Sequence, residues 1–159
     1  MSKHGQLMVL RGIGVAITLE GTMLPTMELL LRHAIQYFGL KGSAMLRDPD
    51  SALDSSDRFL EDLPSLPEDE RSVVLCVHLL CEMFDGDLDR AEFRLWQKIH
   101  YQLHPEAGPI DEGALQAVAR DFRNRKYVTA ATLRKAIEPG AKVPKRSEIF
   151  HNLTQFLLQ

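Results

Sequence analysis

The sequence predicts an all-α fold, a single helical domain of about six to eight helices. One observation is that a small unit occurs twice, about 64 residues apart: an apolar helix, a turn with an acid before glycine, and a helix with an early glutamate. The other is that no stretch keeps the apolar alternation of period two that a half-buried strand requires. At 159 residues and 45% hydrophobic composition, the chain is long enough to bury a sizeable core.

Besides several apolar positions, the turn residues and the early glutamates of the two copies align. These are Glu20 and Asp85, Gly21 and Gly86, and Glu28 and Glu92. The last pair aligns after one residue is counted as inserted in the first copy. Copy one spans about 7–40 and copy two about 68–104, with an acidic linker over 41–67 and C-terminal helices over 111–159.

The first copy predicts a helix over about 5–19 and a second helix from Pro25. Proline suits a first helical turn because its missing N–H would have no intrahelical partner there. Gly39 fits the position just after the helix, where left-handed backbone is common. Gly12 and Gly14 each cost roughly 1 kcal/mol relative to alanine. We therefore expect a neighbouring helix to pack closely against them.

The connection between the copies is rich in serine, aspartate and proline, and residues 51–60 predict one short helix within it. The next helix begins after Pro67 with three acids at 68–70, which the helix dipole favours. We expect this helix to end at Phe84.

Copy two and the remaining chain contain further helix boundary signals. Asp89 and Glu92 fit a capping box at the start of a helix that Pro105 ends. Beyond it we expect three shorter helices, over 111–122, 129–137 and 147–159. The apolar positions expected in the core are Leu10, Val15, Leu31, Ile35, Val74, Leu79, Leu95, Ile99 and Leu115.

Cys76 and Cys81 are five residues apart in a helical stretch, so they do not share a helix face. We therefore expect two buried, reduced thiols in a cytoplasmic protein rather than a disulfide. The longest apolar run, 7–19, contains Arg11 and is too short to cross a bilayer, so we expect no transmembrane segment.

Acidic residues of the two turns are the candidate metal ligands. Asp85, Asp87 and Asp89 alternate as in an EF-hand loop, but that motif requires glycine at position six and glutamate at position twelve, where this chain has Arg90 and Trp96. A weaker site remains if the two turns pool their oxygens. Its candidate ligands are Asp85, Asp87, Asp89, Glu92, Glu20 and Glu28. In the simpler interpretation, the acids only cap helices; both interpretations stay open.

The segment 119–147, near the C-terminus, is basic although the net charge of the chain is −3. Its candidate partner-binding residues are Arg120, Arg123, Arg125, Lys126, Arg134 and Lys135. Phe122 and Tyr127 are the only rings there, so base stacking has little support and no nucleic acid is expected. We expect this segment to pair with the acidic body or to contact a protein partner.

The sequence indicates no enzyme. It has no GxSxG, P-loop or GxGxxG motif, and its six histidines form no HExxH pattern. His100 and His104 are one turn apart, but no nearby acid completes a ligand set.

The repeated unit, which consists of a helix, an acid–Gly turn and a helix with an early glutamate, resembles the TerB family of tellurite-resistance proteins and TerB-like domains. The resemblance rests on Glu20-Gly21 with Glu28, and on the segment from Asp85 to Asp89 with Glu92. It implies an all-helical domain with internal pseudo-symmetry and an acidic surface that binds metal ions. It also implies cytoplasmic work near the membrane in stress-response complexes.

Two hypotheses follow. The first is a non-enzymatic TerB-like module whose acidic centre binds a divalent cation, Ca²⁺, Mg²⁺ or Mn²⁺ because its ligands are all oxygen, or binds a basic partner. The second is a plain protein–protein interaction adaptor or secretion-system accessory, in which the acidic turns are only caps.

Overall fold

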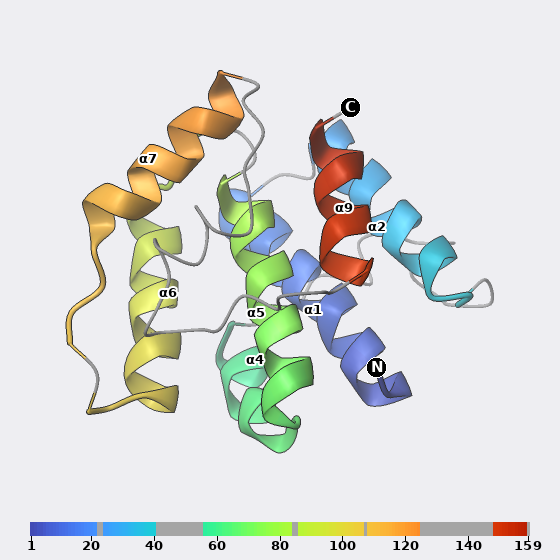
Figure 1. The fold of residues 1–159 in the computed structure, drawn as a ribbon, viewed down its shortest axis with the longest axis horizontal. Helices are drawn as coiled ribbons and strands as arrows, with labels where there is room; N and C mark the ends of the chain where they lie inside the picture. Colours follow the sequence, from blue (N-terminus) through green and yellow to red (C-terminus); the bar gives the residue numbers. More distant parts are fainter. Residues whose placement is uncertain (22–23, 41–55, 84–85, 107, 125–147, 159) are drawn as a thin grey trace. The chain divides into compact units, whose positions relative to one another are not determined.

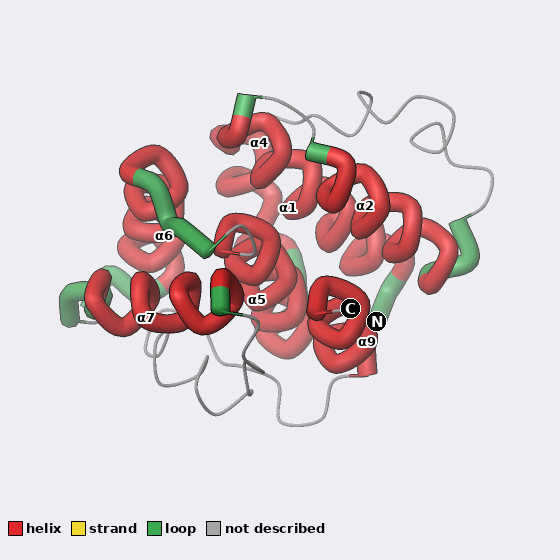
Figure 2. The backbone as a smooth tube through the Cα atoms, turned by 90° about the horizontal axis from the view of Figure 1, so that it is seen from above, coloured by secondary structure: helices red, strands yellow, loops and turns green. Residues whose placement is uncertain are grey.

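The computed structural model describes residues 1–21, 24–40, 56–83, 86–106, 108–124 and 148–158. The predicted all-α class is confirmed, because every regular element in these ranges is a helix (Figure 2). The described α-helices number seven, within the predicted six to eight, and a short 3₁₀ turn follows one of them (Figure 1). None of the described helices is long and apolar enough to cross a membrane.

Two compact units divide the chain, Met1–Cys81 and Glu82–Gln159. The division falls within a helix of copy two, so that copy contributes to both units, whereas the helices of copy one lie in the first unit. The expectation of a single domain over 1–159 stays a prediction.

The first unit contains four α-helices and the 3₁₀ turn. They are α1 (Lys3–Glu20), α2 (Pro25–Tyr37), α4 (Ser56–Asp62), η2 (Leu63–Ser65) and most of α5 (Glu68–Met83). Helix α1 packs against α2 and α4. All six core positions predicted in this unit are buried, as are Phe59 and Leu63 of the linker.

Gly12 confirms the expected close approach to α1. A Cβ at this position would lie 3.3 Å from the Phe59 ring and 3.4 Å from the Cβ of His78. His78 Nδ1–H donates a hydrogen bond of 2.8 Å to the Gly12 carbonyl, which can only accept. A larger residue at Gly12 would push both neighbours away.

Ser2 is the N-cap of helix α1, and its hydroxyl accepts the Gly5 N–H at 3.0 Å. The same hydroxyl donates to Glu70 Oε2 at 2.6 Å, and the Ser2 N–H donates to Oε1. The hydrogen bonds from the Ser2 side chain and backbone lower the pKa of Glu70. The start of α1 is therefore tied to the start of α5.

Helix α2 confirms both of its predicted ends. Pro25 is its first residue, and Gly39 follows it with a φ of 69°. The Gly39 N–H donates to the Gln36 carbonyl and the Leu40 N–H to the Ile35 carbonyl, both at 3.0 Å. These two bonds form a Schellman motif, which requires left-handed backbone at the glycine.

The second unit contains α6 (Arg90–Leu103), α7 (Glu112–Arg123) and α9 (Glu148–Leu158). Leu95, Ile99 and Leu115 are buried as predicted, together with Trp96 and Phe122. The predicted helix over 129–137 lies outside the described residues, as does the start of the short helix predicted over 51–60.

Cys76 and Cys81 are both buried and free, as predicted. Burial raises the pKa of the Cys76 thiol to about 12.

Candidate functional site

Both acid–Gly turns have the same backbone geometry at the glycine. Gly21 and Gly86 have φ values of 73° and 90°. Each donates its N–H to the carbonyl three residues earlier, Thr18 at 3.1 Å and Met83 at 3.0 Å. The aligned glycines therefore both have positive φ values and make the same backbone hydrogen bond in the two copies.

The two turns differ in what surrounds the glycine. A Cβ at Gly21 would have no neighbour within 4 Å. At Gly86 a Cβ would overlap the Cβ of Arg123 and lie 3.0 Å from its Cα. In addition, Gln116 of α7 donates its amide N–H to the Leu88 carbonyl at 2.7 Å. Helix α7 thus packs directly on the second turn.

The predicted capping box at the start of α6 is confirmed. Asp89 Oδ1 accepts the Ala91 N–H at 2.7 Å and the Glu92 N–H at 2.9 Å. Glu92 Oε2 accepts the Asp89 N–H at 2.7 Å, and Glu92 is 1% exposed. The helix start accordingly engages the carboxylates of two of the six candidate metal ligands.

The other candidates lie in different settings. Asp87 is exposed and accepts the Leu88 N–H at 3.0 Å. Glu28 forms an ion pair of 2.8 Å with Arg32, four residues along α2. Glu20 is the last residue of α1, and Asp85 lies outside the described residues. Among the residues that the structure describes, no three His, Cys, Asp or Glu side chains form a group that could hold a metal ion.

The repeat alignment therefore pairs glutamates with different roles. Glu92 completes a capping box, whereas the N-cap residue of α2, Leu24, makes no side-chain cap hydrogen bond and Glu28 pairs with an arginine. Of the predicted partner-binding bases, Arg120 and Arg123 are exposed on α7. Arg125, Lys126, Arg134 and Lys135 lie outside the described residues.

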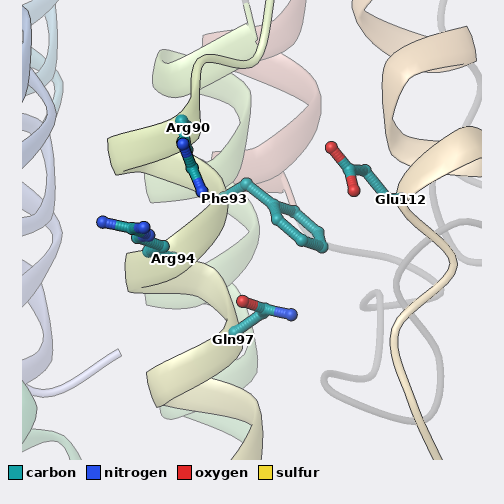
Figure 3. Close-up of a pocket in the computed structure, with 5 residues that line it drawn as sticks. All are labelled: Arg90, Phe93, Arg94, Gln97 and Glu112. Atoms are coloured by element: carbon teal, nitrogen blue, oxygen red, sulfur yellow. The ribbon is translucent and has the colours of Figure 1, made fainter.

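A pocket of about 440 Å³ lies beside α6 and the start of α7 (Figure 3). Its lining residues are Arg90, Phe93, Arg94, Gln97 and Glu112. We call this the α6–α7 pocket. The Phe93 ring and the Gln97 amide extend from α6 toward α7, and the Glu112 carboxylate extends back from α7 (Figure 3). Arg90 and Arg94 are exposed, as is Glu112.

The lining side chains of this pocket take no part in the hydrogen bonds and ion pairs of the described residues. None of the five forms a side-chain hydrogen bond or ion pair with a residue that the structure describes. Arg90 is the first residue of α6, where the helix dipole disfavours a cation by about 0.3–1 kcal/mol. Arg94 lies one turn further, and two like charges at this spacing repel by about 0.2–0.5 kcal/mol. Both placements oppose stability.

Sequence reasoning missed this pocket. The available signal was the spacing of Arg90, Phe93, Arg94 and Gln97, which places them on one face of α6. Glu112 could not be assigned to the same site, because its approach depends on how α7 packs.

The fold and the pocket together define a helical protein with an open, charged surface depression. No protein-family model, curated protein or solved structure matches this chain. The TerB-like expectation, and the tellurite-resistance and stress-response roles that it implies, stay predictions.

Proposed function

We propose that this chain is a non-enzymatic binding module that holds a protein partner at the α6–α7 pocket. The observation that carries this proposal is the set of charged and amide side chains around the pocket that form no side-chain hydrogen bond or ion pair with a residue that the structure describes. A surface that combines a phenyl ring, an amide and charges of both signs suits recognition of a polypeptide.

In this proposal the second acid–Gly turn is structural. Asp89 and Glu92 cap the start of α6, and Gly86 allows α7 to pack against the turn. The turn thereby sets where the start of α6 lies relative to α7, and both helices line the pocket. This favours the adaptor hypothesis, in which acidic turns are caps.

Cation binding stays a second prediction and depends on Asp87 and Asp85, since the capping box engages Asp89 and Glu92. Calorimetric titration of Ca²⁺, Mg²⁺ and Mn²⁺ into chelator-treated protein tests it. Absence of both binding heat and a thermal shift would refute it.

Site-specific photo-cross-linking tests the proposed function. A photoreactive amino acid replaces Gln97 in the full chain, expressed in the cells that naturally produce it, and adducts are identified by mass spectrometry. The matched control carries the same residue at Thr26, an exposed position of α2. We expect protein adducts at Gln97 that are weak or missing at Thr26. Equal labelling at both positions, or none at Gln97, would contradict the proposal.

A further inference from the structure

The exposed bases of α6 form a line beside the pocket. Arg90, Arg94 and Lys98 are each four residues apart, so they share one helix face. All three are exposed, and none forms an ion pair with a residue in the described part of the chain. We call them the basic row. The single acid of α6, Glu92, is buried in the capping box and does not neutralise the row.

The charges of the basic row oppose the stability of α6 in the free protein. Its members repel one another along the helix, and Arg90 stands at the positive end of the helix dipole. Removing these charges should leave the free protein at least as stable. An anionic ligand would reverse both unfavourable terms, because it would neutralise adjacent guanidinium groups at once.

The pocket next to the row limits the size and character of such a ligand. Phe93 and Gln97 are half-buried in its lining, and its volume of about 440 Å³ accommodates a few side chains. Phe93 offers an apolar contact, and the Gln97 amide can both donate and accept a hydrogen bond. A short polypeptide segment with an apolar side chain beside its charges meets these requirements.

Glu112 distinguishes a polypeptide from a polyanion. Its carboxylate extends toward the pocket from α7 (Figure 3). A nucleic-acid backbone or an anionic membrane would place further negative charge against it, at a cost in affinity. A peptide can place its carboxylates at the arginines and a neutral or basic residue at Glu112.

We propose that the basic row and the α6–α7 pocket bind an acidic segment of a protein partner, with carboxylates on Arg90 and Arg94 and an apolar side chain against Phe93. This inference rests on the proposed function and gives the chemistry of the partner.

Selection from a random peptide library displayed on phage tests the proposal. The full chain is the bait, and fluorescence anisotropy measures the Kd of each selected peptide. We expect selected peptides to combine acidic residues with an adjacent apolar residue. The Arg90→Gln/Arg94→Gln double variant should raise the Kd about tenfold or more, and added salt should weaken wild-type binding. Lys3→Gln, at an exposed position of α1 outside the pocket lining, is the matched control and should leave the Kd unchanged.

Three results would overturn this inference: selected peptides without acids, equal affinity for the double variant and wild type, or displacement of the peptide by single-stranded DNA or phosphatidylserine vesicles. In each case, adducts at Gln97 would still support the proposed function. Failure to select any peptide, together with no adduct at Gln97, would contradict both proposals. Far-UV circular dichroism of each variant establishes that it is folded before its Kd is compared.

Discussion

Replacement of each turn glycine by alanine separates the local role of the acid–Gly turn from its packing role. Gly21 and Gly86 occupy aligned positions, have positive φ values and make the same backbone hydrogen bond. They differ in their neighbours, since only Gly86 lies against α7. Gly21→Ala is therefore a control for Gly86→Ala within the same chain.

The expected losses follow from these contacts. An L-residue in left-handed backbone costs about 1–2 kcal/mol, and both variants incur this term. At Gly86 the new Cβ also meets the Cβ and Cα of Arg123. The Cα belongs to the backbone, so no change of rotamer relieves the overlap, and overpacking of this kind costs typically about 1–3 kcal/mol. We expect Gly86→Ala to lose about 2–5 kcal/mol and Gly21→Ala about 1–2 kcal/mol.

Urea denaturation of the full chain measures the difference. Far-UV circular dichroism follows the helices of both units, and fluorescence follows the second unit, since Trp96 is the only tryptophan and is buried in α6. The midpoint should fall further for Gly86→Ala, with the slope against urea unchanged. Equal losses in the two variants would refute the packing role of Gly86 and the argument that the turn positions α7.

Three further outcomes are expected. Asp89→Ala should lower the free energy of unfolding by about 1 kcal/mol, whereas Asp89→Asn should change it little because asparagine caps equally well; equal losses in urea denaturation would mean that the charge, not the cap, matters. Leu31→Ala should lower the free energy of unfolding by about 2–5 kcal/mol because this side chain is fully buried. Leu29→Ala, at a position of the same helix that is 58% exposed, should leave it nearly unchanged; comparable losses would contradict the assignment of the Leu31 face of α2 to the core. Cys76, with its thiol pKa raised by burial to about 12, should resist a thiol reagent at mildly alkaline pH and react after unfolding in urea; rapid labelling of the native chain would contradict its burial.

Most of the local structure could be predicted from the sequence because its signals act over a few residues. Asp89 and Glu92 are three residues apart, and that spacing alone predicts their reciprocal hydrogen bonds to the backbone. Pro25 and Gly39 mark the ends of α2 through their own backbone preferences. The nine predicted core positions are buried because helical periodicity already identifies the apolar face of each helix.

The candidate site could not be predicted to the same extent. The alignment of Glu28 with Glu92 treats two glutamates as equivalent, yet one pairs with Arg32 and the other caps a helix. Each role depends on the residue at the helix start, Leu24 in one copy and Asp89 in the other. The inserted residue of copy one moves its glutamate relative to the turn and removes the capping geometry.

The sequence by itself determined the helical class, the ends of most described helices and the buried face of each, because hydrogen bonds and side-chain periodicity within one helix depend only on nearby residues. Only the tertiary structure decided that Gly86 lies against Arg123 and that Glu112 approaches the face of α6 containing Arg90 and Phe93. These contacts join residues that are about 20 to 40 positions apart. Their formation depends on how whole helices pack, and helical periodicity leaves that choice open.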